Sequence, residues 1–233
     1  MSLLRTEGLT RDFDGLRAVD HVNFDLGAGE VRAVIGPNGA GKTTFVSLLS
    51  GRLAPSAGHV VFEGRDITRL PAHARVGLGI AYTFQITSIF ANLSVYDNIA
   101  LAVQRQARGD MAPEVWRVLD QIGLTERAGE MAGAQSYGHQ RLLEIGMGLA
   151  LRPKLLILDE PTQGLSEGEI DGFLALIRGI SAKTTILLIE HNMDVVMALA
   201  TRITVLDQGR VLADGAPEAI RADGAVQTAY LGG

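Results

Sequence analysis

The strongest constraint on the fold is the run GPNGAGKT at residues 36–43, which fits the pattern G-x-x-x-x-G-K-[ST]. Residues 30–35 before it are short and apolar, as in a strand, and residues 43–50 after it have a helical pattern that ends at Gly51. Glycines let backbone N–H groups converge on phosphate oxygens, and the start of the helix adds partial positive charge. An accidental glycine-rich turn is the alternative, but the order strand, loop, helix favours a phosphate-binding loop.

Residue types within this loop predict ATP and Mg²⁺ as cofactors. Lys42 can reach the β- and γ-phosphates, and the Thr43 hydroxyl can bind Mg²⁺. Backbone N–H groups of the neighbouring positions would surround the same phosphates. The predicted nucleotide-binding residues of the loop are Gly36, Pro37, Asn38, Gly39, Ala40, Gly41, Lys42, Thr43 and Thr44.

Two adjacent carboxylates, Asp159 and Glu160, follow the apolar strand predicted at residues 155–158. In a phosphate-loop protein the first acidic residue at such a strand end helps to hold Mg²⁺, which is the role we predict for Asp159. Glu160 would then lie beside the γ-phosphate and orient or deprotonate the attacking water. Solvated acids at the end of a strand are the alternative. The phosphate loop upstream favours nucleotide hydrolysis.

Strand and helix patterns alternate before and after a helical block, and this alternation predicts an α/β fold with a largely parallel sheet. An antiparallel β region is expected at the N-terminus, around the turn pair Asp14-Gly15. We expect one domain over residues 1–233, with a catalytic core of residues 1–87 and 152–233 and a helical subdomain of about residues 88–151. The expected strands are residues 3–9, 19–26, 30–35, 60–62, 155–158, 184–189, 203–207 and 210–213, and the expected helices are residues 43–50, 95–106, 114–122, 140–151, 167–180 and 193–200.

Composition excludes several classes of protein. The chain has 233 residues, a formal net charge of −5 and no cysteine, so disulfides and thiolate metal sites are excluded and a nucleic-acid surface is not favoured. No apolar run approaches the roughly 20 residues that span a bilayer, and the start of the chain lacks the pattern of a signal peptide. We therefore expect any membrane role to depend on a partner protein.

The segment Gln135-Ser136-Tyr137-Gly138-His139 resembles the signature loop of ABC-transporter ATPases, usually written LSGGQ. Ser136 and Gly138 match this pattern, whereas Gln135, Tyr137 and His139 depart from it. The resemblance implies a P-loop NTPase core of ABC type, in which Ser136 and Gly138 contact the γ-phosphate of ATP bound to a second subunit. Two chains would then enclose two ATP molecules, and hydrolysis would reopen the dimer.

Three further positions resemble the ABC pattern in the same order along the chain. Phe13 stands where the family places an aromatic ring on adenine, Gln85 where a glutamine links Mg²⁺ and water to the membrane subunit, and His191 where a histidine contacts the γ-phosphate. The alternatives are a core aromatic, a surface glutamine and a helix cap. Ser166 departs from the Asp that is frequent in the family. The resemblance implies that Glu160, His191, Gln85 and Lys42 are catalytic and that Thr43, Gln85 and Asp159 hold Mg²⁺.

Residues 82–85, 93–98, 143–147, 189–193 and 229–232 look like importer ATPases for branched-chain amino acids, amides and urea. This resemblance implies two transmembrane permease subunits, a second ATPase subunit that is identical or paralogous, an indirect solute-binding partner outside the cell, and no nucleic acid. The chain would lie on the cytoplasmic face of the membrane. Residues 85–98 would form the coupling surface, although the apolar Ile86, Ile89, Phe90 and Leu93 could instead pack within the helical subdomain. Other functions to weigh are a lipid or lipopolysaccharide exporter ATPase, a soluble ABC protein of translation or DNA repair, and a non-catalytic nucleotide-binding regulator.

Overall fold

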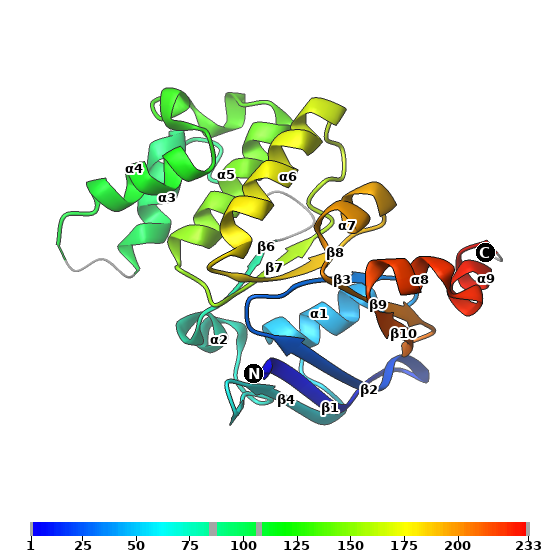
Figure 1. Cartoon of the computed structure of the whole chain (residues 1–233). Coiled ribbons are helices and arrows are strands. Elements are labelled where there is room, and N and C mark those ends of the chain that lie inside the picture. Colours follow the sequence, from blue (N-terminus) through cyan, green and yellow to red (C-terminus); the bar gives the residue numbers. More distant parts are fainter. Residues whose placement is uncertain (1, 84–87, 106–108, 232–233) are drawn as a thin grey trace.

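The computed structural model describes residues 2–83, 88–105 and 109–231, and its strands form two sheets (Figure 1). One sheet is antiparallel with the strand order β2-β1-β4-β5, and the other has the order β10-β9-β3-β8-β7-β6. In the second sheet all neighbours pair in parallel except β9 and β10. The strands are β1 (Ser2–Phe13), β2 (Leu16–Gly27), β3 (Val31–Ile35), β4 (Ala57–Phe62), β5 (Arg65–Asp66), β6 (Ile80–Thr83), β7 (Leu155–Asp159), β8 (Thr185–Ile189), β9 (Arg202–Asp207) and β10 (Arg210–Gly215).

Helices cover both faces of the larger sheet (Figure 1). Helix α1 lies between this sheet and the antiparallel sheet, whereas α3 to α6 cover the opposite face. The expected α/β class with an antiparallel N-terminal region is confirmed. The α-helices are α1 (Lys42–Ser50), α2 (Ala72–Leu78), α3 (Val95–Gln104), α4 (Ala112–Gln121), α5 (Tyr137–Ala150), α6 (Glu167–Ser181), α7 (Met193–Leu199), α8 (Pro217–Ala222) and α9 (Gly224–Leu231).

Strand β7 illustrates why the central strands read as unbroken apolar runs. Leu155 and Ile157 pack into the core shared with α1 and the antiparallel sheet, and Leu156 and Leu158 pack into the core under the helical block. All four side chains are fully buried. A parallel strand covered on both faces needs apolar residues at every position, which removes the alternation seen in half-exposed strands.

Element boundaries differ from the sequence predictions where a cap or a pairing partner decides them. Helix α5 begins at Tyr137 rather than at residue 140, because Ser136 caps it by accepting a hydrogen bond from the His139 N–H at 3.2 Å. The helix predicted at residues 95–106 corresponds to α3, and its predicted last residue, 106, lies outside the described residues. Strand β6 and helices α2, α8 and α9 were not predicted, since each is too short to carry a clear period.

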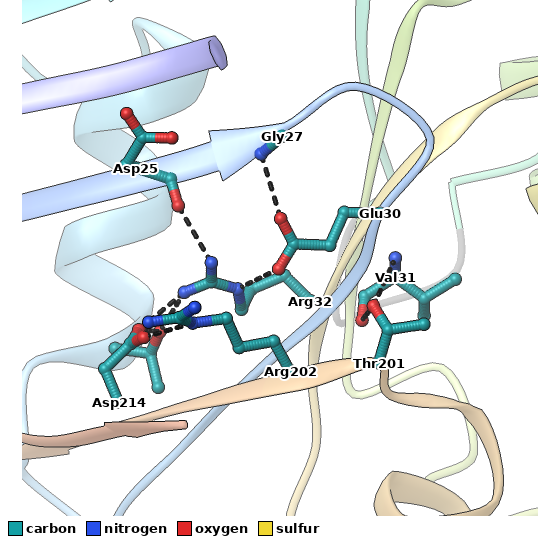
Figure 2. Close-up of polar contacts among 9 residues, drawn as sticks. Asp25, Gly27, Glu30, Val31, Arg32, Thr201, Arg202 and Asp214 are labelled. Carbon is teal, nitrogen blue, oxygen red and sulfur yellow. Dashed lines mark hydrogen bonds and ion pairs between the residues drawn. The ribbon is translucent and has the colours of Figure 1, made fainter. Parts of the chain in front are cut away.

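Arg32 on β3 anchors the junction between the two sheets (Figure 2). Its side chain is buried, and Nε donates to Glu30 at 2.6 Å. The terminal nitrogens donate to the Thr204 hydroxyl at 2.8 Å, to Asp214 at 2.5 Å and to the Asp25 carbonyl at 2.8 Å. These partners come from β2, β9, β10 and the turn before β3. One guanidinium therefore links the base of β3 to neighbouring strands of its own sheet and to β2 of the antiparallel sheet.

No helix in the described part of the chain is both long and apolar enough to cross a bilayer.

Candidate active site

The loop between β3 and α1 requires glycine at two positions where its backbone lies close to another segment of the chain. Gly36 and Gly41 have φ values of 153° and 95°, which L-residues with a side chain rarely adopt. A Cβ on Gly36 would lie 2.2 Å from the Leu206 carbonyl oxygen, and one on Gly41 would lie 2.3 Å from the Ala18 carbonyl oxygen. Among the described residues, no side chain caps the start of α1. The loop thus keeps backbone donors and the positive end of a helix directed toward an anion.

Lys42 lies between this loop and the acids that follow β7. Its Nζ donates to the carbonyl oxygens of Gly36 at 2.6 Å and Pro37 at 2.9 Å. Burial lowers the pKa of Lys42, and the charges of Glu160 and Asp159 act in the opposite direction. The ammonium is therefore held against the carbonyl groups of the loop, and it interacts electrostatically with both carboxylates.

Asp159 is a buried carboxylate at the end of β7, with 2% of its surface exposed. Tyr82 on the neighbouring strand β6 donates its hydroxyl to Asp159 at 2.7 Å. Burial raises the pKa of Asp159, the Tyr82 hydrogen bond lowers it, and the charge of Glu160 raises it again. Carboxylate and hydroxyl oxygens are ligands that Mg²⁺ prefers, and a cation would offset the charge that burial disfavours. Asp159 and Thr43 therefore fit the predicted Mg²⁺ site in their chemistry.

Glu160 occupies a left-handed backbone conformation with φ of 46°. Its N–H donates to the Ile189 carbonyl at 2.9 Å, so the turn is held against the end of β8. Such a conformation costs on the order of 1–3 kcal/mol and is frequent at functional sites. The turn places Glu160 on the wall of the same cavity as the phosphate loop.

Phe13 lies beside the phosphate loop and not in the core. Its side chain is 39% exposed, and the Arg11 guanidinium sits 4.5 Å from the ring centroid. Together with residues 38–44 and Glu160, it lines a cavity of about 680 Å³. The alternative that Phe13 is a core aromatic is therefore wrong. An exposed ring at the mouth of a phosphate site is suited to stacking on a base.

His191 is exposed just beyond the end of β8. The alternative that it caps α7 is wrong, because Asn192 provides the cap and accepts from the N–H groups of Asp194 at 3.1 Å and Val195 at 3.4 Å. The His191 imidazole is thus not used by the helix end. Its backbone N–H donates to Glu190 at 3.0 Å.

Ser136 and Gly138 begin α5, and neither lines the cavity around the phosphate loop. The Ser136 hydroxyl donates to Glu169 at 3.3 Å. A Cβ on Gly138 would lie 2.2 Å from the same carboxylate, so a larger residue would force Glu169 to move. The structure therefore brings Lys42, Asp159, Glu160 and Phe13 into one region, with the signature loop elsewhere on the chain.

Two site neighbours were missed by the sequence analysis. Glu169 accepts from the backbone and hydroxyl of Ser166 at 2.9 and 2.8 Å, and these bonds lower the pKa of Glu169. The S-x-x-E spacing of Ser166 and Glu169 is a capping-box signal that could have revealed this contact. Arg141 is buried on α5 and donates to the carbonyls of Asp159 at 2.7 Å and Glu160 at 3.1 Å. No local pattern predicts that long-range pairing.

The predicted coupling surface is only partly described. Gln85 and Ile86 lie outside the described residues. Phe90 is 53% exposed, whereas Ile89 is partly buried against the helical core. A groove of about 370 Å³ runs between β6 and the helices α2, α3 and α5, with Tyr82 and Met147 on its walls. The apolar residues of this surface therefore divide between internal packing and exposure.

Comparison with known protein families gives two matches. A family described as ABC transporter matches residues 19–163, which contain the phosphate loop, the signature loop and both acids. A family described as branched-chain amino acid ATP-binding cassette transporter matches residues 210–233.

Two curated relatives are similar to nearly the whole chain. The branched-chain amino acid transport ATP-binding protein BraF of Pseudomonas aeruginosa is 37% identical, with 99% of this chain and 98% of the relative covered. LivG of Escherichia coli, of the same description, is 38% identical with the same coverage. A crystal structure of an ABC-transporter ATP-binding cassette in its ADP conformation superposes with a TM-score of 0.91 at 28% identity, covering 100% of both chains. The chain therefore belongs to the ABC transporter family, as an ATP-binding and ATP-hydrolysing cassette.

Proposed function

We propose that this chain is the ATPase subunit of an importer for branched-chain amino acids. The observation that carries the proposal is the cavity that joins Phe13, Lys42 and Glu160, next to a buried Asp159 suited to Mg²⁺. The solute class is supported by the relatives BraF and LivG, which are named for high-affinity branched-chain amino acid transport. No observation favours the exporter, translation, repair or regulator alternatives.

In the proposed mechanism the chain holds ATP by its phosphate loop and adenine by Phe13. Mg²⁺ bound by Thr43, Asp159 and Gln85 would neutralise charge on the phosphates. Glu160 orients or deprotonates the attacking water, and His191 contacts the γ-phosphate. Lys42 stabilises the charge that develops on the transferred phosphoryl group.

The separation of Ser136 and Gly138 from the loop cavity supports a composite site. The start of α5 is a suitable anion site, and the second chain in a dimer would direct it at ATP bound to the first. In this proposal the partner is a second ATPase subunit, either identical or paralogous, and ATP binding closes the pair. The predicted coupling surface, residues 85–98, is the proposed contact with a permease subunit, and its Phe90 is 53% exposed. Such a contact would hold the chain beneath the membrane.

The test is solute uptake by the complete transporter in proteoliposomes. We expect leucine, isoleucine and valine to stimulate ATPase activity when the solute-binding protein is present. Glu160→Gln should retain ATP binding, abolish turnover and accumulate the closed dimer, whereas Glu167→Gln on the exposed start of α6 should behave as the wild type. Full turnover by Glu160→Gln would refute its catalytic assignment. A transporter that hydrolyses ATP but ignores all three amino acids would refute the solute class.

A further inference from the structure

Glu190 is a buried carboxylate that the proposed mechanism does not use. It follows β8 directly, precedes His191 and is 1% exposed. One carboxylate oxygen accepts from the Thr162 N–H at 2.9 Å and from the Thr162 hydroxyl through a short contact. The other accepts from the N–H groups of His191 at 3.0 Å and Asn192 at 3.2 Å.

These donors belong to two different turns. Thr162 lies in the turn after β7, two residues beyond Glu160, and His191 lies in the turn after β8. The two strands pair in parallel up to Asp159 and Ile189, where the Glu160 N–H still donates to the Ile189 carbonyl. Beyond that point the strand ladder ends, and the Glu190 side chain supplies the next set of bonds between the turns.

The energetics of a buried charge make this link specific. An ionised carboxylate removed from water is costly unless it is fully hydrogen-bonded, and bonds to an ionised acceptor are roughly twice as strong as neutral ones. Any motion that separates the two turns would leave Glu190 with half of its donors. The buried charge therefore opposes independent motion of the segments that carry Glu160 and His191.

We infer that Glu190 is a positioning residue that fixes the turn of Glu160 to the turn of His191. This inference rests on the proposed roles of those two side chains. Glu190 itself is too buried to touch the nucleotide, so it acts through the spacing of its neighbours. The two groups directed at the γ-phosphate and its attacking water would then move as one unit.

Glu190→Gln tests the link with little change in volume. The amide has one acceptor where the carboxylate has two, so its NH₂ must face backbone donors of either Thr162 or His191 and Asn192. Backbone N–H groups cannot reverse their polarity, so the variant loses either the bond to the Thr162 turn or the bonds that hold the turn of His191 and Asn192. We expect kcat to fall on the order of 10- to 100-fold, with a change in the KM for ATP of less than about threefold.

A graded series keeps the test valid if Glu190→Gln folds poorly. Thr162→Val removes the hydroxyl and keeps the backbone donor, so its kcat should fall less, and Thr162→Ser should restore the wild-type value. The matched control is Thr6→Val, which removes a buried hydroxyl that donates to the Val22 carbonyl at 2.8 Å in the antiparallel sheet. We expect Thr6→Val to leave kcat unchanged.

The double variant Glu190→Gln with His191→Ala separates positioning from general stability. If Glu190 acts through the positions of Glu160 and His191, the combined loss should be smaller than the product of the two single losses. A wild-type kcat in Glu190→Gln, a multiplicative double variant, or an equal loss in Thr6→Val would each overturn the inference. The proposed function is tested separately, since it falls if wild-type protein does not hydrolyse ATP or if Glu160→Gln does.

Discussion

The two ends of strand β3 differ in the way their polar groups are used. At its base Arg32 is buried, and its guanidinium donates to acceptors on four neighbouring segments. At its tip the chain enters the glycine-rich loop, where Gly36 and Gly41 have positive φ and Lys42 is half-buried. The same five-residue strand thus connects a closed ion-pair network to an open anion site.

This contrast indicates a division of labour along one strand. A binding loop needs exposed donors and unusual backbone angles, and neither contributes to stability. The base of the strand can supply rigidity, because its charges are paired within hydrogen-bond distance and the Phe24 ring lies 5.1 Å from the Arg32 guanidinium. We therefore expect changes at the base to act on stability and changes at the tip to act on catalysis.

The largest effect on stability is expected for Arg32→Met. Removal of the buried guanidinium breaks the ion pair with Glu30 and one of the two ion pairs at Asp214, which should lower the free energy of unfolding by about 3 kcal/mol. For a chain of this size the Tm should fall by roughly 10 °C. Arg202→Met is the matched control, since Arg202 contacts the same Asp214 but is 52% exposed and should cost under about 1 kcal/mol. Equal losses in the two variants, measured by urea denaturation, would contradict the role given to burial.

At the tip, Lys42→Ala should reduce kcat/KM on the order of 100-fold. The reason is the loss of a preorganised charge on the phosphates. Its free energy of unfolding should stay within about 0.5 kcal/mol of the wild type, because Lys42 forms no buried ion pair with the residues that the structure describes. Lys183→Ala, at an exposed position after α6, is the control for removal of one positive charge. Unchanged ATP hydrolysis in Lys42→Ala would refute the role of this lysine.

Phe13→Ala should weaken ATP binding by about 5- to 10-fold, because stacking on a half-exposed ring lies at the lower end of about 1–3 kcal/mol per base. Binding of inorganic tripolyphosphate, which has no base, should not change. Leu16→Ala provides a control, since Leu16 lines the same cavity and is 68% exposed. Isothermal titration calorimetry distinguishes the ligands. Equal weakening for ATP and tripolyphosphate would argue against base stacking.

The smallest expected effect is on the pH dependence of stability and concerns Asp20, a residue of β2 that contacts the turn between β9 and β10. The Asp20 N–H donates to the Gly209 carbonyl at 2.8 Å. Hydrogen bonds from His21, then Arg210, lower the pKa of Asp20 from 3.8 to about 2. A carboxylate whose pKa is lower in the folded state than in the unfolded state stabilises the fold at pH values above its unfolded pKa. This stability is lost as the pH falls from about 4 toward 2. Asp20→Asn should therefore lose less stability than the wild type over this window in acid denaturation. A steeper loss in the variant would contradict the assignment.

How much of the site was predictable varies with the distance along the chain between the partners. The phosphate loop and the acids after β7 were predicted from contiguous residues, and the structure places Lys42 in the field of Asp159 and Glu160. Tyr82 reaches Asp159 across 77 positions, and Arg141 reaches the same turn from α5 across 18. Those partners meet only because β6, β7 and α5 pack together, so no spacing rule could reveal them.

Alternatives left open by local pattern were resolved by exposure and capping. The pattern around residue 191 left His191 open as a helix cap, and the structure gives that role to Asn192. An aromatic at the end of a strand can face the core or the solvent, and the register of β1 with β2 turns Phe13 outward beside the loop.

Local sequence was sufficient for the phosphate loop, since glycine conformation, a helix start and one lysine act within eight neighbouring positions. It was also sufficient for the α/β class, because apolar runs and breaks report the burial of each segment. Packing was required to unite Phe13, the loop and Glu160 in one cavity, and to surround Glu190 and Arg32 with partners. The physical reason is that a buried charge is stabilised by whichever groups the folded chain brings near it, and those groups are distant in sequence.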